Sequence, residues 1–206
     1  RSKTGDKTVD KIVMAKKSPL APSRFPVFPP IDGVRLAAGA CGLRYEGRSD
    51  LMVAELAKNT RIAGVFTQSL TAAAPIDWCR RALKGGRVRA IVVNSGNANA
   101  FTGRVGDAAV RDTVRAAAAG FKCPQNQVFV SSTGVIGEPL PVDRLVKALP
   151  CLQNELDGGA WRAAADAIMT TDTFAKGATR TATIDGVPVT INGIAKGSGM
   201  IAPDMA

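Results

Sequence analysis

RVRAIVVN, residues 87–94, is the clearest strand signal in the chain. Basic entry residues precede a run of isoleucine and valine, which is typical of a buried strand. The polar loop SGNANA follows at residues 95–100, and its asparagines and glycine tolerate the backbone angles of a turn. The loop is either a ligand site or a brace for the turn, and its composition alone favours the brace. An alanine-rich segment with helical spacing comes next, over residues 106–120.

Strand and helix signals continue on both sides of this stretch in irregular alternation. We expect strands at residues 33–44, 51–57, 62–68 and 128–131, and helices at residues 76–83, 141–149 and 158–169. Residues 179–191 are typical of a β-hairpin, because Asp185-Gly186 interrupts the alternating run and favours a type I′ turn. Pro188 indicates that the returning strand is an edge strand. The alternation as a whole predicts layered α/β structure.

The composition argues against some classes of protein. No run of about 18 apolar residues occurs, so we expect no transmembrane helix. The net charge is +10, but half of it lies in residues 1–24, so the rest of the chain is only mildly basic. A nucleic-acid-binding module is therefore supported only by the pI of about 9.9, since the basic residues are scattered and aromatic residues are scarce. A modest positive charge fits small anionic substrates better.

The chain has four widely spaced cysteines and no histidine. Without histidine or a C-x-x-C pair, we expect no metal site of the usual Cys/His type. A Ser-His-Asp or Cys-His catalytic unit cannot be built from these residues, so acyl-transfer chemistry would need another base. We interpret the cysteines as reduced, buried thiols of a cytoplasmic protein.

Three polar segments are candidates for chemistry. Residues 128–134, VFVSSTG, lead a strand into a hydroxyl-rich turn that suits an oxyanion hole, or else a helix cap. Residues 169–176, MTTDTFAK, suit recognition of a polar small molecule, or else a solvated connection. Residues 193–206, GIAKGSGMIAPDMA, place Lys196 where it can approach a carboxylate, or else form a glycine-rich surface loop. Because this last segment is unlike a fraying terminus, we expect the polypeptide to have continued past Ala206.

Four motifs in this order resemble one family, the glutamate N-acetyltransferases, also called ornithine acetyltransferases. They are NSGNANA at 94–100, SSTGVIGEPL at 131–140, MTTDTFAK at 169–176 and GIAKGSGMIAPDMA at 193–206. The resemblance implies an αββα sandwich, with residues 19–206 as one domain shared with a second chain. These residues would be the α chain of a precursor that cuts itself between Ala206 and a threonine. Residues 1–18 lie outside the resemblance as a flexible basic extension, in which Met14 is a candidate native start.

The resemblance implies a ping-pong acetyl transfer in arginine biosynthesis. The N-terminal threonine of the β chain takes the acetyl group from N-acetylornithine, and glutamate then accepts it. The α-amine of that threonine, with an ordinary pKa of about 7.7–8.0, can act as the base, which agrees with the absence of histidine. No cofactor or metal is implied, although acetyl-CoA is an alternative donor in some members. The implied partner is the β chain in an α2β2 heterotetramer, with neither nucleic acid nor membrane involved.

The resemblance also implies roles for particular residues. Thr133, through its hydroxyl, and Gly134, through its backbone N–H, match the oxyanion hole of the family. Thr173 and Lys196 match substrate-binding positions, and Lys196 is expected to pair with the substrate α-carboxylate. Ala206 supplies the carbonyl at which the precursor is cut.

Two alternatives stay open, one for a substrate-binding residue and one for the enzyme class. Thr171 takes the place of Thr173 if the motif is aligned two residues earlier. The family often has proline where Ala175 stands, so the backbone of the binding loop is less restricted in this chain. The alternative enzyme is an N-terminal-nucleophile amidase or aminopeptidase of similar fold, in which water instead of glutamate accepts the acyl group.

Overall fold

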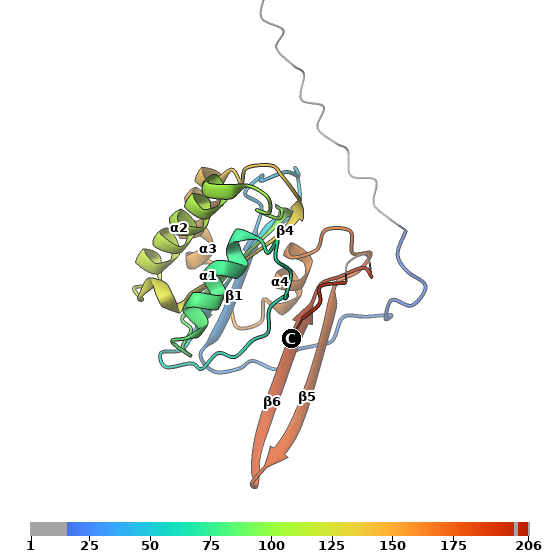
Figure 1. Cartoon of the computed structure of the whole chain (residues 1–206). Helices are drawn as coiled ribbons and strands as arrows, with labels where there is room; N and C mark the ends of the chain where they lie inside the picture. The colour runs from blue at the N-terminus through green and yellow to red at the C-terminus, as the bar shows by residue number, and fades with distance from the viewer. Residues whose placement is uncertain (1–15, 200–201, 206) are drawn as a thin grey trace, which may run out of the picture.

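The computed structural model describes residues 16–199 and 202–205 (Figure 1). Its strands are β1 (Val34–Gly39), β2 (Leu51–Leu56), β3 (Ala90–Asn97), β4 (Val128–Val135), β5 (Lys176–Ile184) and β6 (Val187–Ala195). Its helices are α1 (Ala74–Leu83), α2 (Gly103–Gly120), α3 (Val142–Asn154) and α4 (Trp161–Ala167), with a 3-10 turn, η1 (Gln125–Gln127), before β4. The expected extension at residues 1–15, Met14 included, and the expected cleavage position at Ala206 lie outside the described residues.

The first four strands form one mixed sheet in the order β1-β2-β3-β4. β1 pairs antiparallel with β2, and β2 with β3, whereas β3 and β4 run parallel. A parallel pair needs a crossover connection, and α2 provides it. The strand predicted at residues 87–94 therefore lies inside the sheet as β3, where the side chains of Ala90 and Val92 are buried.

Helices cover both faces of this sheet. α1, α2 and α3 lie together on one face (Figure 1), where Val114 of α2 and Leu145 of α3 are buried in one core with Val92 of β3. On the other face, Trp161 of α4 is buried in a second core with Met52 of β2. Successive residues of a strand point to opposite faces, so one sheet serves both cores. The prediction of layered α/β structure is confirmed.

β5 and β6 form a separate two-stranded sheet that projects from the body of the chain (Figure 1). Asp185 and Gly186 connect them with φ angles of 50° and 80°, as a type I′ turn requires. Pro188 is tolerated because each strand of a two-stranded sheet is an edge. The predicted hairpin is confirmed and is longer than expected, since the pairing extends back to Lys176 opposite Ala195.

Some expected boundaries are wrong. Residues 62–68 form no strand; their backbone makes isolated bridges, Arg61 to Arg87 and Thr67 to Met205, while Ile62 and Phe66 pack against the core. α3 was expected to end before Pro150 but continues to Asn154. A proline inside a helix removes one backbone hydrogen bond, and burial of Leu149 and Leu152 on either side of Pro150 compensates for that loss.

Candidate active site

The base of the β5–β6 hairpin gathers polar side chains from three separate parts of the chain. Lys196 follows β6 directly, Thr170 lies in the loop after α4, and Thr133 lies near the end of β4. The Lys196 ammonium donates hydrogen bonds to Thr170 Oγ1 at 2.9 Å and to Thr133 Oγ1 at 3.1 Å. We call these three residues, with Asp172 and Lys176, the hairpin-base cluster.

Asp172 is the buried centre of the cluster, with no part of its side chain exposed. Lys176 Nζ donates to its Oδ1 at 2.8 Å, and the N–H groups of Gly197 and Thr170 donate to the carboxylate at 2.6 and 3.1 Å. Burial raises the pKa of Asp172, but the hydrogen bonds from Lys176 and the two amides outweigh it and lower the pKa to about 2. Asp172 therefore stays charged at neutral pH.

The donors available to Lys196 fix the direction of its hydrogen bonds. An ammonium group has three N–H donors and no acceptor, so both threonine hydroxyls must act as acceptors toward it. Each hydroxyl therefore keeps its own proton to donate elsewhere. The proton of the Thr133 hydroxyl is therefore available for donation to another oxygen.

Gly134, beside Thr133, lies against the backbone of β3. Its φ of +138° belongs to the region that favours glycine. A Cβ at this position would lie 2.5 Å from the nitrogen of Asn97 and 2.7 Å from the carbonyl oxygen of Gly96. The register of β3 and β4 shifts at this same point, next to Gly96. The chain therefore requires glycine here, which exposes backbone at the position expected to supply an oxyanion donor.

The structure brings the predicted residues Thr133 and Lys196 together. It also places Thr170 in contact with Lys196, and this contact was not predicted from the sequence. The hydroxyl of Thr173 instead accepts a hydrogen bond at 3.3 Å from the N–H of Ser18, a residue of the expected N-terminal extension. Thr171 forms a hydroxyl pair with Ser198 at 2.8 Å. The substrate-binding role of Thr173 stays a prediction, and Thr170 joins it as a candidate.

The loop after β3 is a brace. The side-chain amide of Asn94 donates to the Asn97 carbonyl at 2.9 Å, and that of Asn97 to the Glu138 carbonyl at 3.0 Å. The amide of Asn99 donates to the Gly106 carbonyl at 3.0 Å, which ties the loop to α2. All three asparagines are buried. Their amides serve the backbone that holds β3 and β4 in place, so the bracing interpretation of this motif is confirmed.

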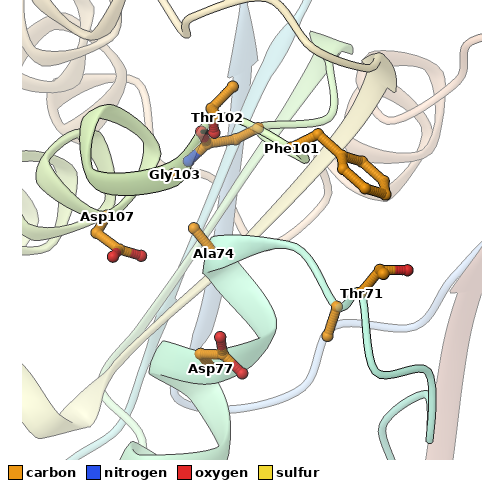
Figure 2. Close-up of a pocket in the computed structure, with 9 residues that line it drawn as sticks. Thr71, Ala74, Asp77, Phe101, Thr102, Gly103 and Asp107 are labelled. Atoms are coloured by element: carbon orange, nitrogen blue, oxygen red, sulfur yellow. Dashed lines mark hydrogen bonds between the residues drawn. The ribbon is translucent and has the colours of Figure 1, made fainter.

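A separate pocket lies between the beginnings of α1 and α2 (Figure 2). It has a volume of about 350 Å³, and Thr71, Asp77, Phe101, Thr102 and Asp107 are among its lining residues. None of the residues of the hairpin-base cluster lines it. This pocket and the hairpin-base cluster are therefore distinct, and Thr133 and Lys196, which the sequence singled out, lie in the cluster.

The remaining expectations concern metals, membranes and cysteines. No group of three or more potential metal ligands occurs within residues 16–199 and 202–205. In the part of the chain that the structure describes, none of the helices combines the length and hydropathy needed to cross a bilayer. All four cysteines are free, but the expectation that all are buried holds only for Cys79, because Cys41 and Cys123 are half-buried and Cys151 of α3 is exposed.

Comparison with known sequences identifies the relatives of the chain. The ArgJ family profile matches residues 35–206. The arginine biosynthesis bifunctional protein ArgJ of Bradyrhizobium diazoefficiens is 52% identical over 189 residues, which cover 92% of this chain and 46% of that protein. ArgJ of Ruegeria pomeroyi is 55% identical over 195 residues, which cover 94% and 48%. The chain thus spans about half the length of the curated relatives it matches.

Solved structures agree with this result. The ornithine acetyltransferase of Mycobacterium tuberculosis, solved in complex with ornithine, matches with a TM-score of 0.79 and 37% identity, over 87% of this chain and 95% of that chain. ArgJ from Bacillus halodurans matches with a TM-score of 0.80 and 35% identity, over 85% and 92%. The mixed α/β fold is shared with these structures.

Proposed function

Because this chain belongs to the ArgJ family, we propose that it forms the part of an acetyltransferase that binds the substrate carboxylate and stabilises the oxyanion. The proposed reaction moves an acetyl group from N-acetylornithine to glutamate. The observation that carries the proposal is the pair of hydrogen bonds from Lys196 to Thr133 and Thr170. It joins a cation, suited to a carboxylate, with a hydroxyl whose proton is available for an oxyanion.

The first half-reaction follows from this placement. The hydroxyl oxygen of an N-terminal threonine on a partner chain bonds to the acetyl carbonyl carbon, and its proton passes to the α-amine of that threonine. The carbonyl oxygen becomes an oxyanion, to which the Thr133 hydroxyl and the Gly134 N–H donate, each contributing about 3–4 kcal/mol. The C–N bond breaks, ornithine leaves with the proton, and the acetyl group remains as an ester on the threonine.

In the second half-reaction, the amine nitrogen of glutamate bonds to the ester carbonyl carbon, and the C–O bond to the threonine breaks. The amine loses one proton, and the threonine hydroxyl regains one through the α-amine. Both substrates carry an α-carboxylate, so one cation at Lys196 serves both half-reactions. Thr170 and Thr173 are the proposed neutral contacts to substrate. The bifunctional character of the curated relatives supports a second donor, for which we propose acetyl-CoA. We propose no cofactor or metal.

The missing half of the site is proposed to belong to a β chain cut from the same precursor after Ala206. This chain covers 46% of a curated relative but 95% of the matching chain in a solved structure. The matching chain of that structure is therefore about as long as this chain, and this similarity in length supports the proposed cleavage of a longer precursor.

The hairpin supports the presence of a partner chain. The register of β5 and β6 places Ile184, Val187, Val189 and Ile191 on one face of this sheet. Ile184, Val187 and Ile191 are each more than half exposed. Apolar side chains gathered in this way indicate a surface that another chain covers. We propose that the β chain covers it within an αββα sandwich and an α2β2 assembly. A cytoplasmic location stays a prediction.

The activity is tested with the protein purified together with its partner chain, N-acetylornithine as donor and glutamate as acceptor. Thr133→Val should lower kcat about 100- to 1,000-fold, because an oxyanion donor is lost. Lys196→Met should mainly raise KM for both substrates. Unchanged rates in both variants would refute the proposed site. Acetate release that does not depend on glutamate would favour the amidase alternative.

Cleavage is tested separately by intact-mass measurement of the expressed precursor. Replacing the threonine expected after Ala206 with alanine should leave the precursor uncut, and replacing it with serine should retain cutting. A normally processed alanine variant would contradict the proposed self-cleavage.

A further inference from the structure

The hairpin-base cluster contains two lysines and one carboxylate. The two lysines lie at different distances from this carboxylate. Lys176 Nζ lies 2.8 Å from Asp172 Oδ1, whereas Lys196 Nζ lies 3.7 Å from Oδ2. We propose that Lys176 neutralises Asp172, so that Lys196 keeps its charge for the carboxylate of the substrate. Asp172 and Lys176 are then positioning residues. This inference rests on the proposed function, because it assumes that Lys196 is the carboxylate anchor.

The other contacts of Lys176 hold it at Asp172. Its Nζ also donates to the Phe174 carbonyl at 3.3 Å and lies 4.5 Å from the centre of the Phe174 ring. A cation over an aromatic face gains further stabilisation. The segment that carries Asp172 therefore holds Lys176, and the charge of Lys176 is paired with the Asp172 carboxylate.

The contacts of Lys196 leave its charge less compensated than that of Lys176. Two of its three N–H donors go to the neutral hydroxyls of Thr133 and Thr170, and its separation from Asp172 exceeds hydrogen-bond length. The two lysines and the carboxylate together carry one net positive charge. We assign this charge to Lys196, where it is available to a ligand. Its third donor can meet an arriving carboxylate.

Asp172 also fixes where Lys196 stands. Its carboxylate accepts from the N–H of Gly197, next to Lys196 in the chain, and from the N–H of Thr170, whose hydroxyl Lys196 contacts. One buried carboxylate thus anchors the backbone on both sides of the Lys196–Thr170 hydrogen bond. A substrate with an α-carboxylate should benefit from this arrangement, and a substrate without it should not.

The test compares two ligands by titration calorimetry on the protein complexed with its partner chain. N-acetylornithine carries the α-carboxylate, and N-acetylputrescine is the same molecule without it. Lys176→Met should weaken binding of N-acetylornithine at least about tenfold, because Asp172 then draws Lys196 toward itself. Binding of N-acetylputrescine should change less than about twofold. Equal losses for both ligands, or no loss for either, would overturn the inference.

Two further variants keep the result interpretable. The double variant Asp172→Asn/Lys176→Met removes both charges, so it should bind N-acetylornithine more tightly than Lys176→Met alone; equal or weaker binding would count against the charge-sharing argument. Asp166→Asn is the matched control, because it breaks the exposed Arg162–Asp166 pair, which has the same four-residue spacing and a 2.8 Å contact. It should change neither affinity.

A crystal structure of Lys176→Met separates this inference from the proposed function. If the wild-type complex transfers no acetyl group, the proposed function fails, and the crystal structure alone then decides the inference. Movement of Lys196 Nζ from Thr133 to within hydrogen-bond distance of Asp172 would support it. An unmoved Lys196 would overturn it.

Discussion

Replacement of Gly134 by alanine tests whether close backbone packing, and not only chemistry, requires a glycine beside Thr133. A Cβ at Gly134 would lie less than 3 Å from backbone atoms of Gly96 and Asn97. Backbone atoms of a sheet cannot turn aside as a long side chain can, so β3 and β4 would have to separate locally. The φ of +138° adds a conformational penalty, since residues with a Cβ rarely adopt it.

The expected cost is the sum of these two effects. A residue held in a sparsely populated backbone region costs about 1–3 kcal/mol, and overpacking in a closely packed region costs about 1–3 kcal/mol. Gly134→Ala should therefore lower the free energy of unfolding by about 2–6 kcal/mol. For a chain of this size, each kcal/mol corresponds to about 2–4 °C in Tm.

Gly137 provides the matched control in the same segment. Its φ is +84°, but a Cβ there would meet no heavy atom of the described chain within 4 Å. Gly137→Ala should cost only the backbone penalty of about 1–2 kcal/mol. Thermal unfolding of the wild-type protein and both variants measures the difference. If Gly134→Ala were no less stable than Gly137→Ala, the argument from backbone contact would be refuted.

Three further predictions concern stability. The pKa of Asp172 in the folded chain is about 2, below its ordinary value of 3.8. Its stabilising contribution is therefore complete above about pH 4 and lost as the pH falls toward 2. Over this range the Tm of Asp172→Asn should fall less steeply than that of the wild-type protein. Asp50→Ala should cost about 2–4 kcal/mol in chemical denaturation, because its buried carboxylate accepts from two backbone amides that would lose their acceptor, and Asp50→Asn should cost less. Leu145→Ala, in the core, should cost about 2–5 kcal/mol, whereas Leu70→Ala, fully exposed, should change stability by less than about 0.5 kcal/mol.

Local signals predicted the parts of the fold that local chemistry determines. β3 was predicted because its run of isoleucine and valine is typical of a buried strand, and β2 and β4 pair with it on both sides. The hairpin was predicted because Asp185 and Gly186 can adopt the positive φ angles that its turn needs. The strand expected at residues 62–68 failed because an apolar run becomes a strand only beside another strand, and this segment has only isolated bridges.

The candidate site was predicted in part. Thr133 and Lys196 were singled out from the sequence, and the structure brings them into contact. Thr170 was missed because 26 residues separate it from Lys196. Long-range contacts, among them the pairing of Lys176 with Ala195 at the hairpin base, bring the two segments together. Asp172 was not recognised as the centre of the cluster, because aspartates are seldom fully buried and its burial depends on donors distant in sequence.

The pairing of β5 with β6 allows the length of the hairpin to change without a change in the geometry at its base. Lys176 and Ala195 are the first pair, and Ile184 and Val187 at the turn are the last. Adding or deleting one residue from each strand near the turn would keep the pairing at the base in register, while the faces near the tip would alternate with each pair. The tip is therefore a place where natural variation or an inserted epitope can alter the chain without displacing Lys196.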